Sequence, residues 1–261
     1  MPEVTAPYTP GTPCWVELTA PDQQAALDFY RDLFGWQGEI GPSDYGGYSV
    51  CTLKGQPVAG VMAAQPMGDQ PAPPTVWTTY LTSADADATH AAVTEHGGSI
   101  VFGPPMDVME LGRMFVASDP AGAVFGVWEP KEFAGAGIVN ENSALIWNEL
   151  ATRNPDSARS FYPAALGIDI ESMEGFEDYF ALNVRGRTVG GMRPLGPETP
   201  EEIPDHWLTY FSVDDADSTV DALVRAGGSV IEPPFDMPAG RMAVVRDPQG
   251  AVFALIKPSP M

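Results

Sequence analysis

The sequence predicts an α+β fold of four tandem βαβββ modules, which form two curled mixed sheets with helices on their outer faces. Three observations predict it. The stretch at 13–36, PCWVELTAPDQQAALDFYRDLFGW, recurs at 145–168 as LIWNELATRNPDSARSFYPAALGI. A second stretch, at 75–105, recurs at 205–234. Four of the six tryptophans each open the first predicted strand of a module, and they are Trp15, Trp77, Trp147 and Trp207.

The first module begins with a strand at 14–19 and a helix at 22–34. The helix is predicted because its apolar residues follow i, i+3, i+4 spacing, and because Gly35 stands where a left-handed residue commonly ends a helix. Aromatic and β-branched residues then predict strands at 46–53 and 56–64, joined by Lys-Gly-Gln.

The second module repeats this order after a proline-rich loop. Its elements are a strand at 76–82, a helix at 85–96 and strands near 99–102, 112–117 and 123–128. The last two strands join through Asp-Pro-Ala-Gly, which returns as Asp-Pro-Gln-Gly in the second half and is typical of a type I turn. The second half repeats both modules with one conflict: Pro163 lies inside its first helix, where it removes a hydrogen bond and predicts a kink.

The repeats also divide the chain into domains. The offset between matching residues drifts from 132 to 130 to 128, as small loop deletions would produce. We therefore predict a first two-module domain at 1–130, a linker at 131–143 and a second two-module domain at 144–261.

The composition argues against several classes of partner. The formal charge is −22, from 13 Lys and Arg against 35 Asp and Glu, so we expect neither nucleic acid nor an anionic membrane as a partner. Cys14 and Cys51 lack metal or redox spacing and are predicted to be buried thiols in a reducing compartment. The chain shows no signal peptide and no apolar run of about 18 residues, so we expect a cytoplasmic protein.

A module with one helix covers only one face of its sheet, so the other face is the place to expect a ligand. Glu17 and Glu149 lie two residues after Trp15 and Trp147, which puts each acid on the same strand face as an indole. In a partly apolar cavity such a carboxylate could serve as a general base. The alternative is that this face lies at a domain interface, where hydrogen bonds hold the glutamates.

The module order, the helix phrase D..AALDFYRDLFGW, the Gly-Gly after the second helix and the Asp-Pro-x-Gly-Ala-Val-Phe turn and strand resemble the vicinal oxygen chelate superfamily. That group includes glyoxalase I, extradiol dioxygenases, fosfomycin-resistance enzymes and bleomycin-resistance proteins. The resemblance covers 12–128 and 144–257 and implies that each half equals one complete glyoxalase-like subunit. It also implies either a monomer that acts as an intramolecular pseudo-dimer or a homodimer.

The same resemblance implies where a divalent metal would bind. The family's metal enzymes place His, Glu or Gln on the first strand of each module and on the strand after the Asp-Pro-x-Gly turn. The aligned positions of this chain are Trp15, Thr78, Gly126, Trp147, Leu208 and Ala254. None of these side chains can bind a metal, so the sequence predicts neither a metal site nor another cofactor.

The remaining candidates are predicted to contact a ligand. They are the four module-opening tryptophans, His206, Arg113 and Arg241. His206 stands before Trp207 on a predicted strand, and with Glu149 it supplies only two ligands for a displaced metal. Arg113 and Arg241 recur in Gly-Arg-Met, where they either hold an anionic ligand or pair with repeated acids. Phe29, Tyr30 and their copies are predicted to be core residues.

Three functions agree with these patterns. The first is a metal-independent binding protein of the glyoxalase and bleomycin-resistance type, which holds an aromatic or apolar small molecule in a tryptophan-lined cleft, for resistance or for secondary metabolism. The second is a glyoxalase-like lyase or isomerase acting on small carbonyl compounds, with Glu17 or Glu149 as base. The third is a protein-interaction module whose clefts are filled by its own side chains.

Overall fold

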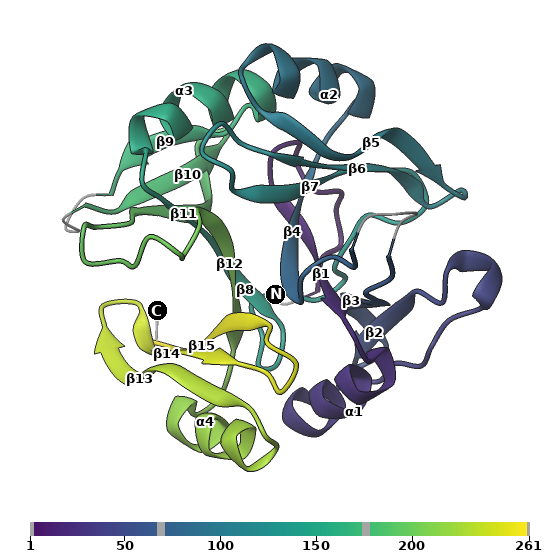
Figure 1. Ribbon diagram of the computed structural model, residues 1–261, viewed down its shortest axis with the longest axis vertical. Coiled ribbons are helices and arrows are strands. Elements are labelled where there is room, and N and C mark those ends of the chain that lie inside the picture. The colour runs from purple at the N-terminus through teal and green to yellow at the C-terminus, as the bar shows by residue number, and fades with distance from the viewer. Residues whose placement is uncertain (1–2, 67–70, 174–177, 260–261) are drawn as a thin grey trace.

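The first half of the chain forms a seven-stranded mixed sheet with two helices (Figure 1). The computed structural model describes residues 3–66, 71–173 and 178–259. The sheet order is β2-β3-β1-β4-β7-β6-β5, so the two modules meet where β1 and β4 pair antiparallel. Its elements are β1 (Pro13–Ala20), α1 (Gln23–Phe34), the short 3-10 turn Ser43–Tyr45, β2 (Ser49–Leu53), β3 (Gln56–Ala63), β4 (Val76–Thr82), α2 (Ala86–Glu95), β5 (Ser99–Val108), β6 (Gly112–Ser118) and β7 (Val124–Pro130).

The second half forms an eight-stranded sheet with the matching order β13-β14-β15-β12-β8-β11-β10-β9. Its elements are β8 (Leu145–Thr152), α3 (Pro155–Leu166), β9 (Asp169–Ser172), β10 (Phe180–Val184), β11 (Arg187–Pro194), β12 (His206–Ser212), α4 (Ala216–Arg225), β13 (Ser229–Met237), β14 (Gly240–Arg246) and β15 (Val252–Pro258). The predicted α+β fold of tandem modules is thus confirmed.

Local signals explain the helix ends. Asp22 caps α1 because its side chain accepts from the backbone N–H of Ala25, and Gly35 ends the helix in the left-handed region at φ 75°. Helix α3 continues across Pro163 to Leu166, so the proline lies in its last turn.

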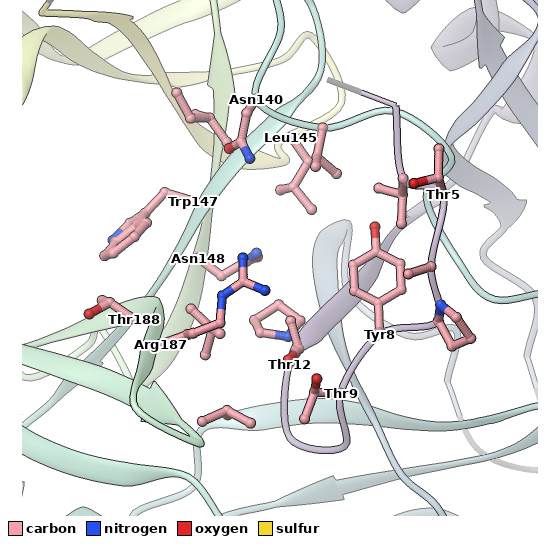
Figure 2. Close-up of a pocket in the computed structure, with 18 residues that line it drawn as sticks. Thr5, Tyr8, Thr9, Thr12, Asn140, Leu145, Trp147, Asn148, Arg187 and Thr188 are labelled. Carbon is pink, nitrogen blue, oxygen red and sulfur yellow. The ribbon is translucent and has the colours of Figure 1, made fainter. Parts of the chain in front are cut away.

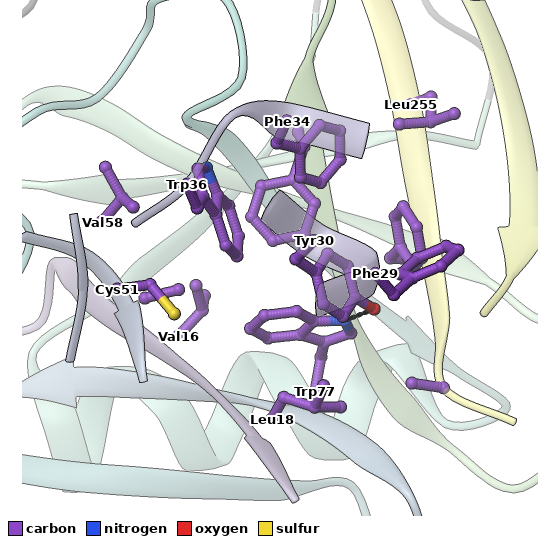
Figure 3. Packing of buried hydrophobic residues seen from close by; sticks show 14 of the residues in the cluster. Val16, Leu18, Phe29, Tyr30, Phe34, Trp36, Cys51, Val58, Trp77 and Leu255 are labelled. Atoms are coloured by element: carbon purple, nitrogen blue, oxygen red, sulfur yellow. Dashed lines mark hydrogen bonds between the residues drawn. The ribbon is translucent and has the colours of Figure 1, made fainter. Parts of the chain in front are cut away.

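Two hydrophobic cores lie between the sheets, and each contains residues of both halves. Figure 1 shows α1 beside α4 at one end of the molecule and α2 beside α3 at the other. Figure 3 shows the aromatic centre of one core, in which the Tyr30 and Trp36 rings are stacked with centroids 5.5 Å apart. Phe211 and Phe253 of the second half complete this cluster.

Two hydrogen-bonded relays cross between the halves. Trp77 Nε1 donates to the Tyr30 hydroxyl (3.1 Å), which donates to Oδ2 of Asp247 in the other half (3.0 Å). The second half contains the matching relay, which leads to the first half: Trp207 donates to Tyr162, and Tyr162 donates to Asp119 of the first half. Each aspartate also accepts one backbone N–H group within its own Asp-Pro-x-Gly turn and one from the alanine that follows, so this turn helps to join the halves.

Candidate functional site

Each sheet has one face that no helix covers, and we call it the helix-free face. Side chains alternate along β1, so Val16 and Leu18 pack toward the helices while Trp15 and Glu17 lie on the helix-free face. Tyr80 joins them, because β4 pairs it with Trp15. In the second sheet the matching residues on this face are Trp147, Glu149 and Tyr210.

A hydrogen-bonded cluster occupies this face of the second half. Trp147 Nε1 donates to the Tyr179 hydroxyl (3.0 Å), and that hydroxyl donates to Glu149 Oε2 (2.8 Å). Arg193 Nε donates to Glu149 Oε1 (2.9 Å). Glu149 is only 4% exposed, and its carboxylate therefore has a cationic partner in a buried place. Burial and the nearby Glu149 raise the pKa of Tyr210. The tyrosines here are therefore neutral hydrogen-bond donors.

The first half repeats the cluster without the cation. Trp15 Nε1 donates to the Tyr48 hydroxyl (2.9 Å), and the Tyr80 hydroxyl donates to Glu17 Oε1 (3.2 Å). The place of Arg193 is taken by Met62. Burial raises the pKa of the Glu17 carboxyl above its ordinary value, while hydrogen bonds from Tyr48 and Tyr80 act in the opposite direction. The site therefore disfavours the charged form of the Glu17 carboxyl.

Two glycines make room for these clusters. Gly60 on β3 and Gly191 on β11 pair with Glu17 and Glu149, respectively. A Cβ on Gly60 would overlap the Tyr48 hydroxyl, and a Cβ on Gly191 would overlap the hydroxyl of Tyr179, the repeat partner of Tyr48. Because any side chain at these two positions would overlap a tyrosine, both positions require glycine.

The linker covers the helix-free face of the first half. Phe133 stands edge-on to the Trp15 ring, with centroids 5.0 Å apart, and its carbonyl accepts from Trp128 Nε1 (2.8 Å). Trp15 is consequently only 5% exposed. Trp147, its repeat partner, is only partly buried. The two faces therefore differ in access.

Two of the four predicted tryptophans lie elsewhere. Trp77 and Trp207 point toward the helices, where they belong to the two cores and start the relays described above. The reason is alternation: β4 pairs Trp77 with Leu18, which faces the core. A tryptophan at the start of a module's first strand therefore does not always lie on the helix-free face.

The basic residues predicted to contact a ligand, Arg113, Arg241 and His206, lie in different places. Arg113 Nη1 donates to Asp87 of α2 (2.6 Å), and Arg241 makes the matching pair with Asp217 of α4, so both arginines fasten a strand to a helix. This agrees with the alternative that they pair with repeated acids. His206 lies on the same strand face as Glu149, opposite Ala151, and its Nδ1 is 2.8 Å from the Pro204 carbonyl.

The residues present do not fit the family's metal centre. In the second half the implied positions hold Trp147, Leu208 and Ala254, which belong to one apolar cluster on the helix-free face. In the first half Gly126 packs directly against the Tyr80 ring. Across residues 3–66, 71–173 and 178–259, no group of three His, Cys, Asp or Glu side chains is placed to hold a metal ion.

A groove of about 420 Å³, which shares Trp147 with the helix-free face, lies between the N-terminal segment and strands β8 and β11 (Figure 2). Of the residues predicted to bind a ligand, only Trp147 lines it. Its other lining residues lie within 4–13, 139–148 and 184–189.

The sequence interpretation missed the tyrosines and Arg193. The repeat carried a signal for the tyrosines, because Tyr48 and Tyr80 recur as Tyr179 and Tyr210 at offsets of 131 and 130. No repeat could have pointed to Arg193, since the first copy has methionine there.

Comparison with known proteins gives a consistent result. The model of the family described as Glyoxalase/Bleomycin resistance protein/Dioxygenase superfamily matches residues 14–127 and 144–255. CFP32 from Mycobacterium tuberculosis, which carries a provisional glyoxylase name, is 43% identical over 258 residues, with 97% of each chain covered. DnrV from Streptomyces peucetius, named as an anthracycline biosynthesis protein, is 37% identical over 263 residues, covering 96% of this chain and 94% of DnrV.

Solved structures share the fold at low identity. The Mn(II)-bound glyoxalase from Novosphingobium aromaticivorans superposes with a TM-score of 0.63 at 18% identity, covering 95% of this chain and 82% of that one. The 2,3-dioxygenase LapB from Pseudomonas sp. KL28 gives 0.61 at 16% identity, covering 98% and 94%. Among the helices that the structure describes, none has the length and apolar content needed to span a bilayer.

Proposed function

The chain belongs to the glyoxalase, bleomycin-resistance and dioxygenase superfamily, and within it we propose a metal-independent protein that binds an aromatic or apolar small molecule. The ligand lies on the helix-free face of the second half, against Trp147. The role is in resistance or in the handling of a secondary metabolite.

The observation that carries this proposal is the chemistry of the second helix-free face. Where the family's metal enzymes need donors, this face presents an indole and aliphatic side chains, and its carboxylate, Glu149, is already held by Arg193 and Tyr179. A flat indole beside aliphatic walls suits an aromatic ligand. Polar groups at one edge, Arg193 and His206, can orient it.

The relatives support the same class of ligand. DnrV of Streptomyces peucetius and DauV of Streptomyces sp. strain C5 are named for anthracycline biosynthesis, and DauV is 38% identical to this chain. An anthracycline is a fused-ring aromatic compound, which is the kind of ligand that the Trp147 face suits. The first half serves as scaffold in this proposal, because Phe133 already covers its indole.

Binding can be tested with a fused-ring aromatic probe, using a neutral anthraquinone and tryptophan fluorescence. We expect one site per chain. Val244→Trp should weaken binding at least tenfold, because Val244 belongs to the apolar cluster of the second helix-free face. The matched control is Val116→Trp, at the same position of the first sheet. Equal effects of the two variants, or a stoichiometric divalent metal in purified protein, would contradict the proposal.

A second candidate is a glyoxalase-like lyase or isomerase, and the state of Glu17 favours it. This acid is largely buried, has no cationic partner and has a raised pKa, as a general base near neutral pH requires. The provisional glyoxylase name of CFP32 points the same way. Turnover of a methylglyoxal adduct that Glu17→Gln abolishes, with affinity unchanged, would establish this activity, and unchanged turnover would exclude Glu17 as base.

A further inference from the structure

At the place in the first half that corresponds to the groove of about 420 Å³, the linker lies against the sheet. There the linker lies directly on β1 and β3: Ala136 N donates to Cys14 O (2.8 Å), and Gly137 N donates to Pro57 O (2.7 Å). A Cβ on Gly135 would overlap the Cys14 backbone, so the linker packs directly against β1 here. In the second half the N-terminal segment runs over β8 and β11 in the corresponding position and leaves the groove.

The groove is depleted of negative charge. The protein has 35 acidic residues among 261, yet no Asp or Glu lines the groove, and Arg187 is its only charged residue. Arg187 is exposed and forms no ion pair with any part of the chain that the structure describes. The first half has Gln56 at the matching hairpin position. A free guanidinium in an acidic protein favours an anion at this place.

A second donor lines the same groove. Asn148 is 2% exposed and lines the groove; its Oδ1 accepts from the Thr79 hydroxyl of the first half (2.7 Å). No group in the described ranges accepts a hydrogen bond from its Nδ2, so this buried amide keeps a donor for a ligand. The first half has Val16 here. Figure 2 shows the Asn148 amide and the Arg187 guanidinium on one side of the groove and the Tyr8 ring on the other.

From these contacts we propose that the groove is a second small-molecule site, which binds an organic carboxylate. The planar guanidinium of Arg187 can give a carboxylate two parallel hydrogen bonds, and Asn148 Nδ2 can add a third. We expect the rest of the ligand to be apolar or aromatic, because Leu145, Val189 and the Tyr8 ring are also in the lining, together with neutral threonine side chains. A volume of 420 Å³ lies within the range of small-ligand sites.

The test is calorimetric titration of the full chain with sodium benzoate. Arg187→Gln, which installs the residue of the first half, should weaken benzoate binding at least tenfold. The matched control is Arg185→Gln, which removes the same charge from the same hairpin but from a residue that does not line the groove; it should leave binding unchanged. Asn148→Val should weaken binding at least threefold, with circular dichroism confirming the fold.

The design separates this groove from the aromatic site of the proposed function. Benzoate binding should persist in Val244→Trp, whose effect is confined to the helix-free face, and loss of binding in that variant would place benzoate there instead. The proposal is overturned if wild-type protein gives a flat titration, if Arg187→Gln binds as wild type, or if Arg185→Gln is equally impaired. Tighter binding of inorganic phosphate than of benzoate would overturn the ligand class.

Discussion

Glu17 and Glu149 occupy the same place in the two copies, and one neighbour distinguishes them. Glu149 has Arg193, whereas Glu17 has only tyrosine hydroxyls and the methionine at position 62. A buried carboxylate without a cation is costly to ionise, so its proton is held more tightly in the folded protein than in the unfolded chain. The first copy therefore carries an acid whose charge the fold disfavours.

This difference predicts a pH-dependent stability. The pKa of Glu17 is higher in the folded protein than in the unfolded chain. Between these two pKa values the folded protein holds a proton that the unfolded chain has lost. The free energy of unfolding therefore falls as the pH rises through this range. Glu17→Gln should therefore raise the melting temperature at pH 8, and its advantage should shrink as the pH falls toward 4. Thermal melts of both proteins across this range measure it, and a pH-independent difference would contradict the assignment.

At the residue scale the sequence predicted the paired acids and indoles because each occurs twice. It could not predict which indoles face a ligand, since Trp77 and Trp207 differ from Trp15 and Trp147 only in strand register, and register depends on pairing across the sheet. Arg193 and Arg187 were not predicted, because each occurs in one copy only and the repeat therefore gave no signal for them.

At the scale of elements, the helices and nearly all strands follow from local signals. The strand β9 was not predicted, and in the first half the corresponding contact is a single bridge between Gln37 and Thr52. A four-residue strand with mostly exposed side chains has no strong pattern of its own; it forms because β10 supplies a paired edge. The linker was predicted as a boundary, whereas the structure also uses it to cover a sheet face.

The role of the linker predicts a specific effect of Phe133→Ala. Removing this ring uncovers Trp15, so acrylamide should quench tryptophan fluorescence more strongly than in the wild type. Stability should fall by about 1–2 kcal/mol, less than for a fully buried phenylalanine because Phe133 is partly exposed. Phe235→Ala, which removes an exposed ring from β13, is the control. Unchanged quenching would show that Phe133 does not protect the indole.

At the scale of the whole molecule, the halves share both hydrophobic cores and both Trp–Tyr–Asp relays. The sequence predicted the duplication, which the two sheets of matching strand order confirm. Neither the shared cores nor the crossing relays could be predicted, because the repeat does not show which residues of one copy meet the other. Tyr30 and Tyr162 were expected in the core, and their hydroxyls reach across it.

Shared cores predict one cooperative unfolding transition for the full chain. Tyr30→Phe should remove a hydrogen bond to Asp247 and the acceptor for Trp77, at a cost of about 2 kcal/mol, and Tyr162→Phe should cost about the same. Urea unfolding followed by near- and far-ultraviolet circular dichroism should give coincident curves for both variants. Two separated transitions, one for each half, would contradict this coupling.

Covalent joining of the copies has a consequence for how the chain can change. In a symmetric pair of separate subunits, every substitution is made twice, so a ring that closed one cavity would close both. Here Phe133 covers the helix-free face of one copy only, Arg193 changes that face in the other copy only, and Arg187 and Asn148 line a groove of the second copy. Fusion thus lets selection act on one copy for recognition while its twin preserves the architecture.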